Sequence, residues 1–183
     1  MINNNLALYK NGETEESQKQ LWTKELENAV NKQIELELTN FATYQELSNY
    51  FSNAERGLYG IAKFFEKESD EELKHSREFM NYQIKRGGSV GSINSMPIDI
   101  SELENASNKI ITAYQIALAQ EKFTYLALLE LHEISCNDPA FQDFIEEFLK
   151  EQVETQYKLN NIIKLLQLGG SVYCAIHEEN LRE

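Results

Sequence analysis

The segment that decides the fold is Arg86–Ser101, RGGSVGSINSMPIDIS, in the middle of the 183-residue chain. It contains three of the eight glycines and one of the two prolines, where an average chain of this length would carry about 22 such residues in total. A partly apolar connection of this length can cross a whole bundle of helices. We therefore expect it to join two helical halves of the protein.

The other glycines and prolines are also clustered, and they leave four long blocks between them. The blocks are 13–56, 61–86, 98–138 and 140–168. Each block has helical periodicity and is rich in residues that favour helices. Helices of about 30 residues are about 45 Å long, and four of them form a bundle.

Two of the connections are short, which predicts antiparallel hairpins. After the first block, Ser52 or Asn53 is expected to cap the second helix. Before the fourth block, Asp138 and Pro139 give an N-cap residue followed by proline at the first helical position. The long crossover ends at Ser101, which is expected to cap the third helix. The predicted fold is all-α: a four-helix bundle of two antiparallel hairpins, with the long crossover between helices two and three.

The chain divides into three parts on this interpretation. Residues 1–14 form an N-terminal extension, residues 15–170 form the bundle, and residues 171–183 form a short C-terminal helix or tail. The pattern of Val172, Ala175 and Ile176 after Gly169-Gly170 favours a short fifth helix.

Charge and composition exclude several classes of function. The formal net charge is −13, and no basic cluster is longer than Lys85-Arg86, so we expect no nucleic-acid partner. No apolar run is long enough to span a membrane and no leader pattern is present, so we expect no membrane partner. Cys136 and Cys174 are too few for a disulfide framework. These features predict a soluble protein in the cytoplasm.

Five polar residues interrupt the apolar faces of the predicted helices. They are Glu37, Glu72, His75, Glu121 and Gln152. Glu37, for example, has apolar residues at offsets −7, −3, +4 and +7. Such positions normally face the core of a bundle, where an isolated carboxylate costs several kcal/mol, on the order of magnitude known for buried ions.

A metal site explains these residues economically. Glu72 and His75 form a Glu-x-x-His motif, which projects both side chains from one face of a helix. One Glu from each of two other helices completes the arrangement of carboxylate di-iron bundles. The alternative is that each Glu is solvated, which is the more common state of a single Glu on a helix.

Several motifs together give the chain a specific resemblance. They are Glu37-Leu38 with Tyr44 seven residues later, Ser69–His75, Arg86–Gly88, Glu121-Lys122, Asp138-Pro139, Asp143–Glu146 and Glu151–Val153. In combination they resemble the ferritins over Gln33–Gly170. This resemblance implies the ferritin-like four-helix bundle as the fold.

The resemblance also implies roles for the polar residues. Glu37, Glu72 and His75 look like ligands of the first iron of a ferroxidase centre, with Glu72 bridging. Glu121 and Gln152 look like ligands of the second iron. Tyr44 resembles a tyrosine beside the centre, where it donates an electron or a proton; a core tyrosine with a satisfied hydroxyl is the alternative.

Three positions distinguish this chain from related subfamilies. Gln152 and Thr155 stand where bacterioferritins carry a second Glu-x-x-His, so the site resembles the asymmetric ferritin type. Leu73 stands where a haem-ligating Met would fall, so no haem is expected. The length argues against the smaller Dps-like shells.

Some acidic sites of the family are altered. Lys74 and Arg77 occupy positions where related chains carry mineral-nucleating carboxylates, so we expect nucleation either to be slower or to occur elsewhere. Prokaryotic ferritins have a third iron site formed by acidic residues. Three of these acids match Glu71, Glu151 and Glu154 here, and Thr155 replaces the last one.

The function implied is that of an iron-storage subunit with ferroxidase activity. It would oxidise Fe2+ to Fe3+ with O2 or H2O2 and deposit a ferric oxide mineral inside a homo-oligomeric shell of about 24 subunits. Asp143 and Glu146 resemble acids that line iron channels. The alternative is that they are acids at the start of a helix, where the helix macrodipole favours them.

Two other functions stay open: a storage subunit without ferroxidase activity, and a di-iron oxygenase or peroxidase of the rubrerythrin kind. The absence of a Cys-x-x-Cys module speaks against the last.

Overall fold

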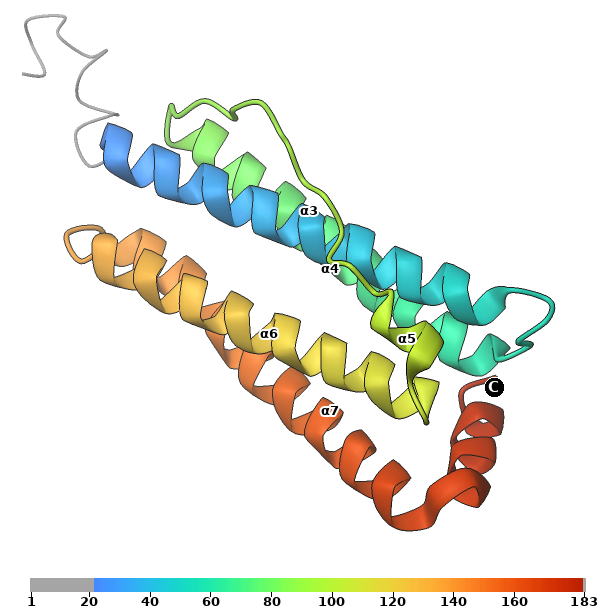
Figure 1. The fold of residues 1–183 in the computed structure, drawn as a ribbon. Coiled ribbons are helices and arrows are strands. Elements are labelled where there is room, and N and C mark those ends of the chain that lie inside the picture. The colour runs from blue at the N-terminus through green and yellow to red at the C-terminus, as the bar shows by residue number, and fades with distance from the viewer. Residues whose placement is uncertain (1–21, 183) are drawn as a thin grey trace, which may run out of the picture.

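The computed structural model describes residues 22–182, and these residues form helices and connecting segments without any strand. The helices are α3 (Lys24–Ser52), α4 (Tyr59–Lys85), α5 (Glu102–Asn105), α6 (Lys109–Ile134) and α7 (Pro139–Asn180). The α3–α4 hairpin packs against the α6–α7 hairpin (Figure 1). The predicted all-α bundle of two hairpins is confirmed. The predicted extension, residues 1–14, lies outside the described residues.

Side-chain caps begin three of the long helices. The hydroxyl of Thr23 accepts a hydrogen bond from the backbone N–H of Leu26 at the start of α3. Asn108 does the same at the start of α6. Asp138 accepts from the N–H of Phe141 at 3.2 Å, with Pro139 at the first helical position of α7. This last cap is the one predicted.

Two predicted caps are wrong. Ser101 precedes only α5, a single turn in which its side chain makes no capping hydrogen bond, and α6 starts at Lys109. Asn53 follows the end of α3 instead of starting α4, and its side chain accepts from the N–H of Glu55. Asn and Ser side chains close turns as well as they cap helices, so their presence alone does not fix where a helix begins.

The crossover runs along the outside of α3 and joins the two hairpins (Figure 1). Asn31 holds its start: its side-chain amide donates to the carbonyl of Ser89 and accepts from the N–H of Gly91. Further along α3, the hydroxyl of Thr43 accepts from the N–H of Ile98 at 3.0 Å. The chain therefore traverses the bundle, as the sequence predicted.

The C-terminal segment turns back on the bundle at Gly170, which has φ +58 inside the span of α7. The carboxylate of Glu178 then accepts from the N–H groups of Gly60 and Ile61, at 2.9 and 2.8 Å. A buried anion is stabilised there because the start of α4 presents unpaired N–H groups. A short C-terminal helix is therefore present, while the division of the chain at residue 170 stays a proposal.

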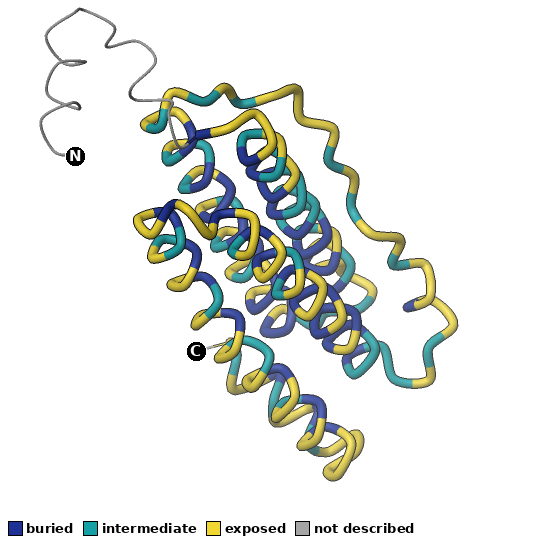
Figure 2. The backbone as a smooth tube through the Cα atoms, turned by 90° about the vertical axis from the view of Figure 1, so that its left-hand side faces the viewer, coloured by how far each residue is buried: buried dark blue, intermediate teal, exposed yellow. Residues whose placement is uncertain are grey.

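The buried faces of the helices point toward the interior of the bundle (Figure 2). This interior consists of two apolar clusters with a polar layer between them. One cluster includes Tyr44, Phe51 and Phe65, and the other includes Val30 and Phe79. The polar layer consists of Glu37, Asn40, Glu72, His75, Glu121, Thr124 and Gln152, all buried. Within residues 22–182, no helix is long and apolar enough to cross a membrane.

Candidate metal centre

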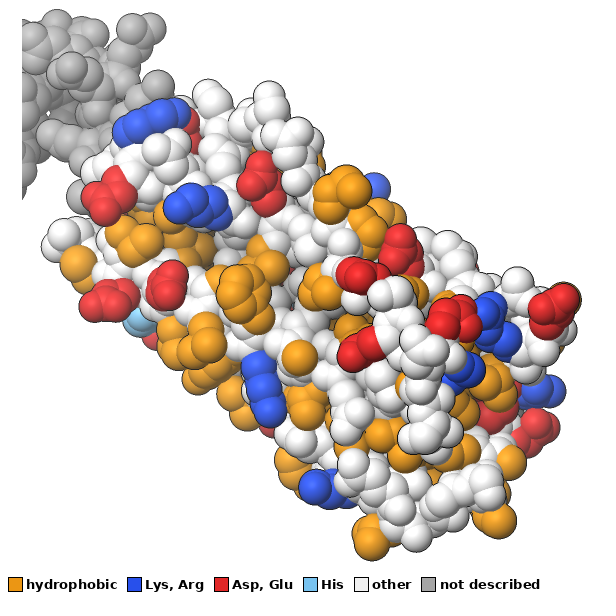
Figure 3. Space-filling model, viewed as in Figure 1, with side chains coloured by type: hydrophobic (Ala, Val, Ile, Leu, Met, Phe, Trp, Pro, Cys, Tyr) orange, Lys and Arg blue, Asp and Glu red, His pale blue; other side chains and the backbone are white. Residues whose placement is uncertain are grey.

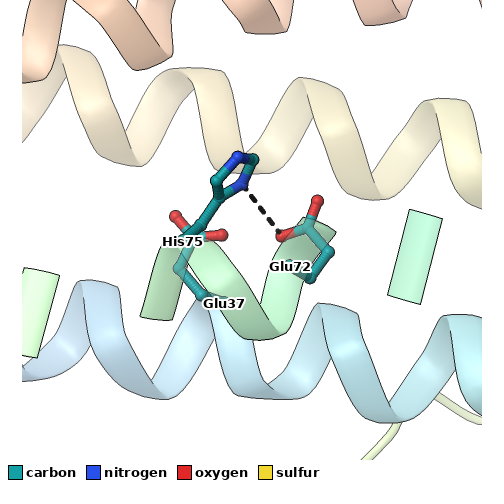
Figure 4. A group of neighbouring side chains, drawn as sticks. All are labelled: Glu37, Glu72 and His75. Carbon is teal, nitrogen blue, oxygen red and sulfur yellow. Dashed lines mark ion pairs between the residues drawn. The ribbon is translucent and has the colours of Figure 1, made fainter. Parts of the chain in front are cut away.

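Glu37, Glu72 and His75 converge in the polar layer (Figure 4). Glu37 comes from α3 and the other two from α4. At most 5% of the surface of any of the three is exposed. One ligand atom from each lies within 4.8 Å of the others, and His75 Nδ1 is 4.0 Å from a carboxylate oxygen of Glu72. This is a compact set of hard oxygen donors with one imidazole nitrogen.

Glu121 of α6 and Gln152 of α7 form the other half of the layer. The Gln152 amide donates to one carboxylate oxygen of Glu121 at 2.7 Å. The hydroxyl of Tyr44 donates a short hydrogen bond to the other oxygen. The structure thus brings all five predicted ligand residues into one layer, although only the first three form a single compact group. The predicted tyrosine belongs to the neighbouring apolar cluster and reaches the layer through its hydroxyl.

The layer places several carboxyl groups close together and away from solvent. Burial raises the pKa of Glu72 well above its usual value, and Glu121 and Glu37 raise it further. Burial also raises the pKa of Glu121 to about 7, despite hydrogen bonds from Tyr44 and Gln152 that lower it. No lysine or arginine is among the buried side chains of residues 22–182. The arrangement is therefore suited to cations that enter from outside.

Some donor atoms in the layer are free to bind such a cation. Glu37 Oε2 and Gln152 Oε1 are buried and have no hydrogen-bond partner among the described residues. Unsatisfied buried polar atoms are rare in folded proteins and require an explanation. Metal ligation supplies one.

Two amide residues orient the candidate ligands, and the sequence interpretation missed both. Gln33 donates to Glu37 at 2.7 Å. Asn40 donates to Glu72 at 3.2 Å and to the hydroxyl of Thr124 at 2.9 Å. The available signal was their spacing, since residues 33, 37, 40 and 44 recur on one face of α3.

The residues predicted for a third iron site are only partly brought together. Glu71, His75 and Glu151 offer ligand atoms within 4.8 Å of one another, and Glu151 is 3.4 Å from His75 Nε2. Burial disfavours the charged form of His75, but Glu151 and Glu37 outweigh it and raise the pKa of His75. Glu154 is exposed and lies outside this group.

Asp143 and Glu146 lie on the surface near the start of α7. Glu146 is 3.6 Å from His132 Nε2 on α6. Both acids face solvent in the single chain, so their role in a channel depends on an assembly and stays a proposal.

The fold and the site together define a class: four-helix bundles that carry carboxylates and histidine between their helices. A ferritin-like domain matches residues 27–169, and the chain belongs to the ferritin family. It is 37% identical to ferritin-1, chloroplastic, from Brassica napus over 159 residues, which cover 85% of this chain and 62% of the relative. It is 35% identical to ferritin-3, chloroplastic, from Glycine max over 167 residues, or 89% of this chain and 65% of the relative.

These relatives also correct one prediction. The chain spans slightly under two thirds of their length, and they are named chloroplastic, as is the similar ferritin of Malus baccata var. xiaojinensis. The prediction of a cytoplasmic location is contradicted by these names and is wrong. The lack of a secretory leader pattern and of a membrane span, on which it rested, does not distinguish one aqueous compartment from another.

Proposed function

We propose that this chain is an iron-storage subunit that binds Fe2+, oxidises it to Fe3+ at a di-iron ferroxidase centre, and deposits it as a ferric oxide mineral inside a shell of about 24 identical subunits. One observation carries the proposal. Three carboxylates and an imidazole are buried in one layer, and no cationic side chain is buried with them in the described part of the chain. Membership in the ferritin family supports the same function.

The donor set is suited to iron in both oxidation states. Glu37, Glu72 and His75 would hold the first Fe2+, with Glu72 shared with a second ion. Glu121 and Gln152 would complete the second position. Hard oxygen ligands stabilise Fe3+ more than Fe2+, which favours oxidation, and the neutral Gln152 binds more weakly than a carboxylate and so favours release.

The chemistry balances with either proposed oxidant. Two Fe2+ ions each lose one electron, and O2 takes up both electrons and two protons to give H2O2. With H2O2 as the oxidant, the same two electrons and two protons break the O–O bond and give two water molecules. The centre's contribution is to hold both ions close enough to reduce one oxidant.

Residues around the centre have proposed roles as well. Tyr44, hydrogen-bonded to Glu121, would supply an electron or a proton. Glu71, Glu151 and Glu154 would form a third iron site, for which the proximity of Glu71 and Glu151 gives partial support. Asp143 and Glu146 would line an iron channel between subunits.

The test is removal of the ligands from α4. The double variant Glu72→Ala/His75→Ala should oxidise Fe2+ at least about tenfold more slowly than the wild type, measured as the appearance of ferric absorbance in air. Glu66→Ala is the matched control, because Glu66 is on the same helix but exposed. If the double variant oxidised Fe2+ as fast as the wild type, the ferroxidase assignment would be wrong.

A further inference from the structure

A groove of about 940 Å3 opens between α3 and α6, beside α5 and the end of the crossover. Figure 3 shows this face of the molecule, with acidic side chains beside the crossover and hydrophobic ones along α6. Asp99 and Glu102 line the groove and are exposed. Asn40 and Gln120 also line it, but they are buried.

These two buried amides lack partners for part of their polar atoms. Gln120 is 3% exposed, and neither its amide nitrogen nor its amide oxygen has a hydrogen-bond partner within residues 22–182. The same holds for the amide oxygen of Asn40. Buried amide groups beside a cavity large enough for water are normally satisfied by ordered water. The inner end of the groove is therefore built to hold small molecules that form hydrogen bonds.

A chain of hydrogen bonds connects this end of the groove with the candidate metal centre. The Asn40 amide nitrogen donates both to Glu72 and to the hydroxyl of Thr124. The Thr124 hydroxyl donates in turn to the backbone carbonyl of Gln120 at 3.2 Å. A molecule bound between Asn40 and Gln120 is thus one side chain away from Glu72.

We propose that this groove binds water and hydrogen peroxide and delivers peroxide to the metal centre from the α3–α6 face. The inference rests on the proposed ferroxidase function and adds the route and the chemical class of the oxidant. Hydrogen peroxide both donates and accepts hydrogen bonds, which matches the free donor of Gln120 and the free oxygens of both amides. O2 has no hydrogen to donate, and a divalent cation needs charged ligands that the buried end does not offer.

The reaction that the route serves is balanced. Two Fe2+ ions at the centre give one electron each, the O–O bond of the peroxide breaks to give two hydroxide ions, and two protons from the solution convert these into two water molecules. No further reductant or oxidant is needed.

The variant Gln120→Leu tests the route, because it removes both unpaired amide atoms with little change of volume and leaves every proposed ligand in place. In the assembled full-length protein, the initial rate of Fe2+ oxidation by H2O2 should fall about fivefold, the effect of one lost hydrogen bond, while the rate with O2 should change less than twofold. Gln167→Leu is the matched control, because Gln167 is exposed on α7 and lies outside the groove, so both rates should be unchanged.

A second variant blocks the groove without touching a buried amide. Ala119 is exposed and lines the groove, so Ala119→Trp should slow oxidation by H2O2 even if Gln120→Leu does not fold. An equal loss with both oxidants, or no loss in either variant, would overturn the peroxide route while leaving the ferroxidase function intact.

A crystal structure of the metal-free wild type separates this proposal from the proposed function. Ordered water bonded to the amides of Asn40 and Gln120 supports it, whereas an empty groove or amides rotated onto protein partners would overturn it. If the wild type oxidised Fe2+ with neither oxidant, the ferroxidase function and the delivery route would both be wrong.

Discussion

Glu121 is a buried side chain whose protonation would be coupled to the proposed binding of iron. Its carboxyl group is almost completely buried and its pKa is raised to about 7, mainly by burial. The proton that stabilises this group in the metal-free protein has to leave before a cation can bind. Metal affinity should therefore increase as the pH rises through about 7.

The same shift predicts a pH-dependent stability. The folded pKa lies above the unfolded value of 4.5, so folding favours the protonated form, and stability is lost as the pH rises from about 4.5 to about 7. Metal-free wild type should be more stable at pH 5.5 than at pH 7.5, with about 3 kcal/mol per subunit available from this group over the full range. Glu121→Gln should remove much of that slope in thermal denaturation. A metal-free wild type with the same melting temperature at both pH values would contradict the prediction.

The proposed role of Tyr44 depends on its hydrogen bond to Glu121. Tyr44→Phe removes the hydroxyl that donates to Glu121 and retains the ring that packs against Phe65. We expect Fe2+ binding to persist and Fe2+ oxidation to slow by about two- to tenfold, as for the loss of one positioned hydrogen-bond donor. Stopped-flow absorbance measures the oxidation and anaerobic titration the binding. Tyr50→Phe, on the same helix, is the control, and an equal effect there would refute a specific role for Tyr44.

At the scale of elements, the C-terminal segment is held by the end of another helix. Glu178 satisfies two N–H groups at the start of α4, and Gly60 allows this close approach. A Cβ atom at position 60 would lie 2.1 Å from the backbone oxygen of Glu178. The contact therefore requires glycine at this position.

Gly60→Ala should release the segment after Gly170. We expect a loss of about 1–3 kcal/mol, the cost of leaving buried polar groups unpaired, together with faster proteolysis of residues 171–182. Gly91→Ala is the matched control, because a Cβ atom there would meet nothing closer than 3.6 Å. The docking contact would be shown to be unimportant if both variants melted at the wild-type temperature.

The helices were predictable from the sequence where two signals agreed. Asp138 and Pro139 mark one helix start with two independent preferences, and α7 begins there. Asn53 was a single signal, and it lies in a turn. Ser101 with Glu104 three residues later matched one motif, the capping box, yet Ser101 precedes only the single turn of α5 and makes no capping hydrogen bond. A single polar residue near a helix end does not fix the end, because local turn hydrogen bonds compete with the cap.

The site was predictable for a related reason. Glu37, Glu72 and Glu121 are charged residues inside apolar stripes, which is a strong departure from the helical pattern. Gln33 and Asn40 are neutral, and an amide in such a stripe is a weaker departure, so their contacts with the ligand carboxylates became visible only in three dimensions.

For the whole molecule, the net charge of −13 has two parts. Most acidic side chains are exposed and would attract cations to the surface at low ionic strength. Glu37, Glu72 and Glu121 lie between the helices instead.

Iron loading of the assembled protein tests the central proposal most directly. The purified protein is given Fe2+ in air, and its mass and iron content are followed together by analytical ultracentrifugation. The account predicts a particle of about 24 subunits that gains dense iron mineral, while the Glu72→Ala/His75→Ala variant forms the same particle and fills it at least about tenfold more slowly. A small assembly that never accumulates iron would contradict it.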